Sequence, residues 1–506
     1  MKSKIVKIIR SVCLIISAIV VLISAGCEDF LTKDPANVIA SSEFFQNEHQ
    51  VNQGVVSIYA SLQNVYDNHW KFAEQRSDNT TVQFWQANRG PHPIWLMEEF
   101  TMDASNQNIG PYWNGTYTGI QRANTILNQI ENVEFSDESY KNQLIGESQF
   151  LRALFYFHLV RLFGDVPLVL NQVESPSESF ATIEKRNSVE EVYNQILEDA
   201  NSAISNLPQQ YTDANTGRAT EGAARALLAD ILMTRKNYGE ARVELENIIQ
   251  MEYELLPSYE DVFDPGNKNN AEIIFDVNYS SVETNPGLGS RFIYNFAPWN
   301  SGSKITGHNA STQGLNIPSI EIYSAYSDWD KRKDVAIGYF IDPSNEGQGI
   351  AMGDTILYVK KYDHPHPVQG RTDDNCSVYR YAHVLLMLAE CINEIEGPTT
   401  EAYIAINEVR ERAGLEPLPA DLSQEDFRQS VFDEMQLELA FENHRWFNLL
   451  RTGKAKETME RHGELYRDRQ PHFATPAYVI EEYKFLYPIP QREITLNPNL
   501  TQNPGW

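Results

Sequence analysis

The segment from residue 141 to residue 163 carries apolar side chains around nearly its whole circumference when it is drawn as a helix. Leu144 and Leu151 belong to one stripe at helical spacing, and several aromatic residues lie beside that stripe. A helix of this kind has to be covered by other elements on every side. Gly164 provides its C-terminal end. We therefore expect a helical body built around this segment, in which His158 is a hydrogen-bonded core residue and not a catalytic base.

Further helices are predicted on both sides of this segment. Ser41 and Ser42 precede a helical stripe that runs from Phe44 to Leu62. Ser188 and Glu191 form a capping box at the start of another helix. The stretch 223–250 contains two helices joined by a short turn, and this pair resembles a tetratricopeptide (TPR) unit. Similar pairs are expected at 117–163, 380–413 and 425–450, as degenerate repeats inside one domain.

Two stretches between the helices have no sustained periodicity. Residues 70–113 contain four of the 8 tryptophans among Asn, Gln, Gly and Pro, and residues 264–318 have a similar composition. Only short strands are expected there, such as residues 273–277. Long ordered loops on a rigid scaffold are where binding residues usually lie, so these two stretches are the first candidates for a site.

The charge of the chain excludes several classes of partner. There are 41 Lys plus Arg against 69 Asp plus Glu, which gives a formal net charge of -28. Beyond the first ten residues the densest basic run is Lys331-Arg332-Lys333, which Asp330 and Asp334 flank. A chain this acidic is repelled by phosphate backbones and by anionic lipid surfaces. We therefore expect no nucleic-acid partner.

The first 26 residues are predicted to be a signal peptide. A basic start is followed by an apolar stretch from Val12 to Ile23, which is too short for a membrane-spanning helix. The stretch ends in Ser24-Ala25-Gly26-Cys27, which resembles a bacterial lipobox and implies acylation of Cys27. The membrane is then contacted through the lipid anchor only. An ordinary cleavage site that happens to contain a cysteine is the alternative.

The remaining cysteines and the other reactive side chains do not form a known catalytic or metal-binding motif. Cys391 lies about ten residues into a predicted helix, and Cys376 precedes that helix. Their Cα atoms are then too far apart for a disulfide, so both cysteines are expected to be unpaired. There is no phosphate-binding loop, nucleophile elbow, His-Glu-x-x-His or Cys-x-x-Cys motif. His364 and His366 are interpreted as residues of a solvated loop, and the adjacent pair Glu98-Glu99 as unrelated acids that point apart. The sequence predicts neither an enzyme nor a cofactor.

Several ordered segments resemble the SusD/RagB family of surface lipoproteins. The first is Gly146-Glu147-Ser148-Gln149-Phe150-Leu151-Arg152-Ala153-Leu154-Phe155-Tyr156-Phe157, followed by Leu162-Phe163-Gly164-Asp165-Val166-Pro167-Leu168. The terminal segment Asn497-Pro498-Asn499-Leu500-Thr501-Gln502-Asn503-Pro504-Gly505-Trp506 is similar to the way the family's sequences end. Further matching segments lie at 380–390, 406–410, 438–449 and 487–491.

The resemblance implies a mainly α, SusD-like fold, in which TPR-like helix pairs form a scaffold with long ordered loops and a few short strands. Residues 27–506 are then one domain. Its helical N-terminal part covers about 27–250, and its helical C-terminal part about 376–506. Loop-rich insertions for the ligand face are expected at about 68–115 and 264–375. Arg152 and Arg445, which lie in shared motifs, are expected to form buried ion pairs.

The resemblance also implies a function. Members of this family are outer-membrane lipoproteins that face the cell exterior, bind a glycan and deliver it to a SusC-like TonB-dependent transporter. Glu28-Asp29 after Cys27 is similar to the acidic tag associated with surface display. A peptide-binding uptake lipoprotein of the RagB type and a TPR-like protein-interaction scaffold are the alternatives.

Ligand contacts can be ranked on chemical grounds. The C–H face of a pyranose packs on an aromatic ring, while its hydroxyls need Asn, Asp, Arg or Gln nearby. Residues 76–89 combine both kinds of group, and residues 294–299 supply another aromatic edge. For each tryptophan, burial in a packed loop core is the alternative. The predicted contacts are Trp85, Asn88, Arg89, Arg76 and Asp78 in the first stretch and Tyr294 and Trp299 in the second.

Overall fold

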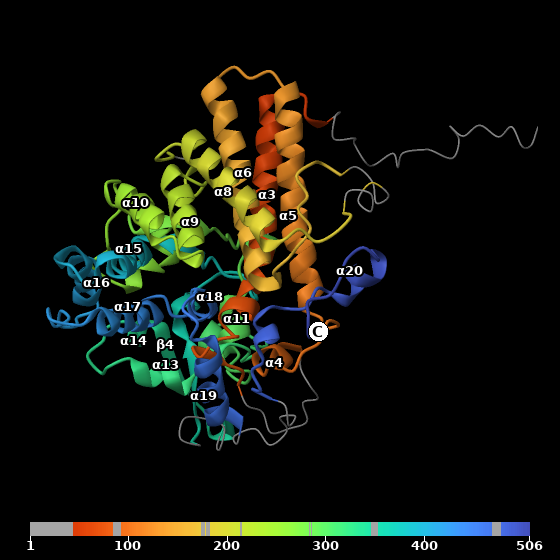
Figure 1. Cartoon of the computed structure of the whole chain (residues 1–506). Coiled ribbons are helices and arrows are strands. Elements are labelled where there is room, and N and C mark those ends of the chain that lie inside the picture. Colours follow the sequence, from red (N-terminus) through yellow and green to blue (C-terminus); the bar gives the residue numbers. More distant parts are fainter. Residues whose placement is uncertain are drawn as a thin grey trace, which may run out of the picture.

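A computed structural model describes residues 44–83, 93–173, 178, 183–212, 215–282, 284, 286–345, 353–467 and 477–506. Within these residues the protein is mainly helical, with short strands and long loops between the helices (Figure 1). Some residues with predicted roles lie outside the described part of the chain, and what was expected of them stays a prediction. Those predicted to carry the lipid or contact the ligand are Cys27, Trp85, Asn88 and Arg89.

Three long helices stand side by side at one end of the molecule (Figure 1). They are α3 (Glu48–Ala73), α5 (Ile109–Gln129) and α6 (Glu138–Phe163). The apolar segment that we expected at the centre is α6, which is buried along most of its length. It ends at Gly164, whose φ of 72° suits glycine.

The first long helix differs from its prediction at both ends. Asn47 is the N-cap of α3 and accepts from the Gln50 N–H at 3.0 Å, while Ser41 and Ser42 lie outside the described residues. The helix also continues through Trp70, which we had placed in a loop. Trp113 likewise belongs to α5. The loop predicted between these two tryptophans is therefore shorter than expected.

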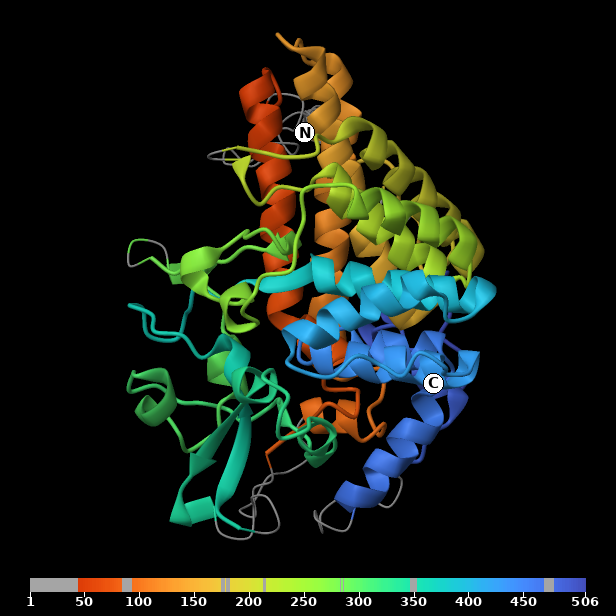
Figure 2. The same cartoon turned by 90° about the vertical axis from the view of Figure 1, so that its left-hand side faces the viewer.

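Helix pairs continue from this bundle across the molecule (Figures 1 and 2). In chain order each of the next helices packs on its predecessor, so that α6 contacts α8, α8 contacts α9, α9 contacts α10 and α10 contacts α15. The predicted capping box of Ser188 and Glu191 is present at the start of α8. The helices are α8 (Val189–Asn206), α9 (Glu221–Thr234), α10 (Tyr238–Ile249), α15 (Tyr381–Glu396), α16 (Thr400–Arg412) and α17 (Gln424–Glu438).

The loop-rich part lies beside these helices (Figure 2). It contains three antiparallel pairs, in which Thr81 pairs with Ile317, Val277 with Cys376, and Ile341 with Thr355. The strands are β1 (Thr80–Thr81), β2 (Ile273–Val277), β3 (Ile317–Pro318), β4 (Ile337–Ile341), β5 (Thr355–Val359) and β6 (Cys376–Arg380). The short helices are α4 (Pro93–Glu98), α11 (Phe292–Phe296), α12 (Ser303–Thr306), α13 (Ile320–Ala325) and α14 (Lys333–Ala336).

The C-terminal segment closes against the end of α6. It follows α18 (Arg445–Arg451) and α19 (Ala455–Arg467) and contains α20 (Gln491–Leu496). The Asn503 amide donates to the Phe163 carbonyl at 2.9 Å and to the Tyr487 carbonyl at 2.8 Å. These contacts join the end of α6 to the end of the chain.

A buried ion-pair network joins the strands to the C-terminal helices. Arg380, at the end of β6, contacts Glu272, Glu438 and Glu442, and its side chain is 1% exposed. The network contains five cationic and five anionic side chains, so each buried charge has a partner of opposite sign. Its members are Arg332, Lys361, Arg380, Arg410 and Arg412 with Glu272, Asp330, Glu434, Glu438 and Glu442.

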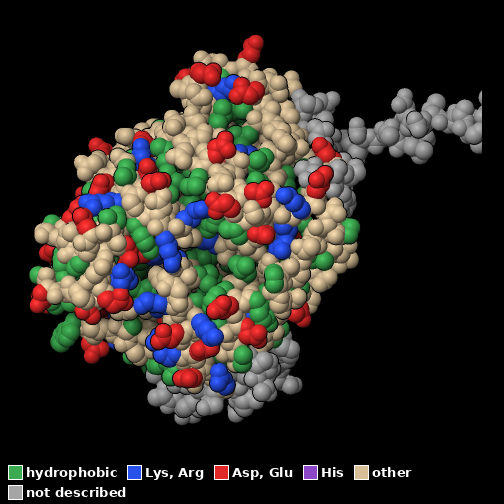
Figure 3. Space-filling model, viewed as in Figure 1, with side chains coloured by type: hydrophobic (Ala, Val, Ile, Leu, Met, Phe, Trp, Pro, Cys, Tyr) green, Lys and Arg blue, Asp and Glu red, His purple; other side chains and the backbone are tan. Residues whose placement is uncertain are grey.

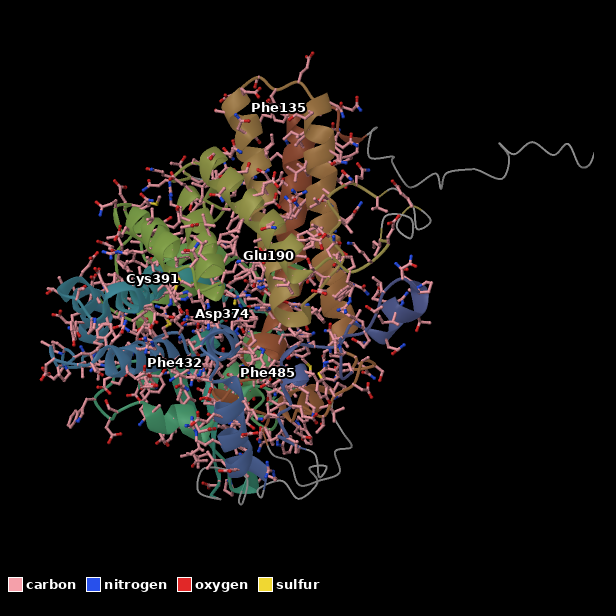
Figure 4. The ribbon with its side chains drawn as sticks, viewed as in Figure 1. Phe135, Glu190, Asp374, Cys391, Phe432 and Phe485 are labelled. Carbon is pink, nitrogen blue, oxygen red and sulfur yellow. The ribbon has the colours of Figure 1, made fainter. Side chains whose placement is uncertain are left out.

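The remaining predictions about core residues are confirmed. Cys376 and Cys391 are buried and unpaired, and Figure 4 labels the second on α15. His158 is 2% exposed, and its Nε2 lies 3.0 Å from the Tyr66 hydroxyl. No helix within the described residues is both long and apolar enough to cross a bilayer. On the face drawn in Figure 3, acidic and basic side chains are interspersed.

Candidate functional site

Trp299 lies in the loop after α11, and backbone hydrogen bonds fasten this loop on one side. The Gly314 N–H donates to the Ala297 carbonyl at 2.8 Å, and the Leu315 N–H donates to the Asn295 carbonyl at 2.8 Å. The Thr312 hydroxyl donates to the Pro298 carbonyl. The half-buried indole of Trp299 is therefore carried by an ordered backbone.

Gln83 joins the two loop stretches that the sequence placed far apart. Its side-chain oxygen accepts a hydrogen bond from the backbone N–H of Trp299 at 2.9 Å, and its own backbone N–H donates to the Gly314 carbonyl at 2.7 Å. Gly314 has a φ of 59°, and a Cβ at this position would lie 2.5 Å from the Gln83 side-chain oxygen. Gln83 therefore connects residues of both loop stretches, 216 positions apart in the chain.

Asn300 fastens the other side of the same loop. Its amide donates to the Ser344 hydroxyl at 2.9 Å and to the Asn345 side-chain oxygen at 2.9 Å. The Asn300 side-chain oxygen, the Asn345 amide nitrogen and the Gln83 amide nitrogen are buried and have no hydrogen-bond partner among the described residues. Sequence reasoning missed these three amides, although the Asn- and Gln-rich composition of the loops was a signal for them.

Tyr294 takes a supporting position and not the surface position that was predicted. It is 4% exposed, and its hydroxyl lies 2.7 Å from His366 Nε2. The His366 carbonyl is in turn 2.8 Å from His308 Nε2. In its present position the Tyr294 ring cannot offer a face to a ligand, because it is packed in a small core with Phe340 and Tyr358.

His364 and His366, which we expected in a solvated loop, make hydrogen bonds within the fold. His364 Nδ1 lies 2.6 Å from Asp374, which Figure 4 labels. Burial lowers the pKa of His364, but the hydrogen bond to Asp374 and its charge outweigh burial, so that the net shift is upward. Among the described residues, no cluster of three or more His, Cys, Asp or Glu side chains is arranged to hold a metal ion.

Arg76 and Asp78 were predicted as ligand contacts, and this prediction is wrong for the structure described here. Arg76 is 0% exposed and lies between the Phe100 and Tyr487 rings, at 4.1 and 4.3 Å from their centroids. Asp78 is 2% exposed, and Arg445 donates to both of its oxygens at 2.8 Å. Both residues belong to the core that supports the loop.

The ion pairs expected of the two motif arginines are confirmed. Arg152 donates to both oxygens of Asp199, at 2.8 and 2.7 Å, and Arg445 pairs with Asp78 as described above. Burial raises the pKa of Asp78, but Arg445 outweighs burial and the net shift is downward. These arginines therefore connect helices and loops within the fold.

Other candidates from the sequence are core residues. Trp70, Trp95 and Trp113 are 2%, 3% and 4% exposed. Glu98 and Glu99 are buried as well, and Glu98 accepts from the Thr81 and Tyr478 hydroxyls. Burial and the neighbouring Glu98 raise the pKa of Glu99 to about 8. A separate cavity of about 640 Å³ lies between α5 and α20, and Trp113 and Tyr117 are among its lining residues.

Comparison with known proteins relates the chain to glycan-binding proteins over most of its length. A model of the SusD family matches residues 290–506, and a model described as "Starch-binding associating with outer membrane" matches residues 29–233. The chain is 28% identical to SusD-like protein P25 of Formosa agariphila, over 94% of this chain and 95% of the relative.

Two further relatives have names that state a ligand. The starch-binding protein SusD of Bacteroides thetaiotaomicron is 23% identical over 76% of each chain. A solved structure of a laminarin-binding SusD-like protein superposes with a TM-score of 0.74 at 26% identity, over 91% of this chain and all of the other.

Proposed function

We propose, from the premise that this chain belongs to the SusD family, that it binds a glycan at the outer membrane and delivers it to a partner transporter. The two family models together span both the helical scaffold and the loop-rich part of the chain. Relatives named for starch and laminarin favour a neutral oligosaccharide or polysaccharide as the ligand. This likeness along the whole chain is the observation that carries the proposal.

The ligand is assigned to the loops around Trp299. An indole face suits the C–H face of a pyranose, and the buried amides of Gln83, Asn300 and Asn345 hold the loop that carries this indole. Trp85 supplies a second stacking ring in this proposal, with Asn88 and Arg89 as hydroxyl partners. Tyr294 supports the Trp299 loop from beneath.

Binding is proposed to occur without turnover of the ligand. A glycoside hydrolase needs two carboxyl groups about 5 or 6.5–9.5 Å apart that face one cleft. The adjacent buried pair Glu98 and Glu99 is instead held inside the fold. Incubation with a bound oligosaccharide is expected to produce no new reducing ends over hours, and release of reducing ends that follows the pure protein would overturn this part of the proposal.

Delivery requires a membrane protein next to this one. Acylation of Cys27 would hold the protein at the outer membrane, facing the cell exterior, and a SusC-like TonB-dependent barrel would carry the glycan inward. Two proteins in one membrane have a high effective concentration for each other, so their interface does not need extreme affinity. Affinity purification from native outer membrane in mild detergent is expected to recover the barrel. Recovery of this protein alone, from membranes that contain the barrel, would contradict the delivery step.

The proposal is tested by calorimetric titration of the mature protein with laminarin, soluble starch and a panel of neutral glycans, with acidic and neutral peptides as the second arm. Saturable glycan binding that Trp299→Ala weakens supports it. Binding of peptides alone would favour the RagB-type alternative. A stable protein complex without any glycan or peptide dependence would favour the TPR-like scaffold.

A further inference from the structure

Trp329 is the most exposed large apolar side chain among the described residues. It lies in the turn between α13 and α14 and is 83% exposed. The structure gives its indole no hydrogen bond and no ring contact with any described residue. Indoles are usually buried or half-buried, because an exposed indole places a large apolar area in contact with water. An indole in this position is available to an external partner.

The turn that carries Trp329 is fixed from both sides. Before it, the Tyr326 hydroxyl donates to the Leu437 carbonyl at 2.7 Å, and the Asp330 N–H donates back to the Ser327 carbonyl at 3.2 Å. After it, Arg332 is fully buried and pairs with Asp330 in the ion network. The indole is therefore presented by an ordered backbone, which reduces the entropy that binding has to overcome.

A chain of contacts connects this turn to the outer face of the β4–β5 hairpin. Lys333 Nζ lies 3.3 Å from Asp328 and 4.6 Å from the centroid of the Tyr323 ring. The Tyr323 and Tyr339 rings meet edge to face at 6.2 Å between centroids. Tyr339 is 44% exposed. We call Trp329, Tyr323, Tyr339, Asp328 and Lys333 together the aromatic strip.

The aromatic strip is separate from the loops around Trp299. Side chains alternate along β4, so that Tyr339 and Phe340 point to opposite faces of the hairpin. Phe340 packs with Ile293 and Tyr294 in the small core under the Trp299 loop. The strip and the candidate site therefore use the two opposite faces of one hairpin.

The charges around the strip favour a neutral ligand. Residues 328–334 contain three acids and three bases, so this segment is formally neutral in a chain whose net charge is -28. Asp328 and Lys333 already neutralise each other, and the Asp328 carboxylate can accept hydrogen bonds from hydroxyls while the Lys333 ammonium can donate to them. The core of a protein interface is a continuous apolar surface. The aromatic strip has separate rings with polar groups between them, and this arrangement suits successive sugar units better than it suits a protein partner.

We propose that the aromatic strip is a second contact surface for the glycan, on which Trp329 and Tyr339 stack on pyranose C–H faces while Asp328 and Lys333 bind hydroxyls. The proposal rests on the glycan-binding function proposed above. A chain long enough to reach both faces of the hairpin would be held at two points, which raises avidity for polysaccharide over short oligosaccharide.

The test compares Trp329→Ala, Trp299→Ala and the control Ile404→Ala, whose side chain is 63% exposed on α16. The mature protein in mild detergent is titrated with laminarin, soluble starch and the hexasaccharide of each. We expect Trp329→Ala to weaken polysaccharide binding by about three- to tenfold and to remove one of two hexasaccharide sites. Ile404→Ala is expected to bind as the wild type does.

Each other outcome is informative. Loss of binding in Trp299→Ala, with polysaccharide affinity and stoichiometry unchanged in Trp329→Ala, would overturn the strip and leave the proposed function standing. A wild type that binds none of these glycans would overturn both. Unchanged glycan binding in Trp329→Ala, with loss of the barrel that co-purifies from native membrane, would identify the strip as a protein interface and overturn the proposal.

Discussion

The side chain of Gln83 accepts a hydrogen bond from the backbone N–H of Trp299, although 216 residues separate the two positions. Gln83 is fully buried, and it is the last described residue before the segment that carries Trp85. Gln83 therefore holds the Trp299 loop against the end of the segment that follows β1.

Replacement of Trp299 by alanine should weaken glycan binding. Loss of one stacking ring is expected to cost about 1–2 kcal/mol, roughly a tenfold rise in Kd, because the C–H face of the sugar loses its aromatic partner. Isothermal titration with the best-bound oligosaccharide measures the change. Trp506→Ala, which removes another half-buried tryptophan at the C-terminus, is the matched control and should keep wild-type affinity. An unaltered Kd in folded Trp299→Ala would move the site elsewhere.

Replacement of Gln83 by leucine tests the connection between the loops. The variant keeps the volume of the side chain but removes the acceptor for the Trp299 N–H, at a cost of about 0.5–1.5 kcal/mol in stability. We expect a larger relative loss in glycan affinity than in melting temperature, since both loops lose their common fixed point. Equal affinities for Gln83→Leu and wild type would mean that the connection has no part in binding.

Replacement of Arg380 by alanine should destabilise the whole protein. It leaves the buried carboxylates of Glu272, Glu438 and Glu442 short of a cation, which typically costs about 3–5 kcal/mol. Urea unfolding followed by circular dichroism measures the free energy. The control is Arg235→Ala, which breaks a pair with Glu190 whose side chains are 30% and 64% exposed and should change stability by less than about 1 kcal/mol. Similar losses in both variants would contradict the assigned role of the network.

The contribution of His462 to stability should depend on pH. Burial lowers the pKa of His462, but Glu321 and Glu98 outweigh burial and raise the pKa to about 9. A raised pKa means that the folded state binds the proton more tightly, so the stabilisation is complete below the unfolded value of about 6.5 and is lost as pH rises through about 9. The melting temperature of the wild type should exceed that of His462→Gln by more at pH 6.5 than at pH 10. A difference that does not vary with pH would argue against an imidazolium at this position.

Replacement of Cys27 by alanine should release the protein from the membrane fraction. The change removes the predicted site of acylation while the described fold begins only at residue 44, so the melting temperature of the body should be kept. Fractionation followed by mass spectrometry of the N-terminal peptide measures both location and acylation. Membrane association that persists without any acylated species would contradict the anchor.

Local patterns predicted the helices well and the site only in part. The apolar circumference of α6, the capping box of α8 and the strand at Ile273–Val277 depend on neighbours within a few residues, and all three are present. Asp78 shows where this reasoning ends. Its partner Arg445 is 367 residues away, so no local signal separates a buried ion pair from a ligand contact.

The same limit applies to the candidate site. The aromatic composition of the two loop stretches pointed to Trp299, but the position of Gln83 beside it follows from how the strands pair and not from any local pattern. Tyr294 has the type of side chain that contacts sugars, yet its ring is packed in a small core. Which aromatic ring in a loop faces outward is decided by packing, which the sequence does not display.

The ion-pair network sets an order for the folding of the chain. During synthesis Arg332 and Arg380 emerge before Glu434, Glu438 and Glu442, which belong to α17 and the turn after it. Until these carboxylates arrive, Arg332 has only Asp330 and Arg380 has only Glu272 as a network partner, so the loop-rich middle of the protein cannot complete its packing early. The loop-rich part that carries Trp299 therefore completes its packing only after nearly nine-tenths of the chain has been synthesised.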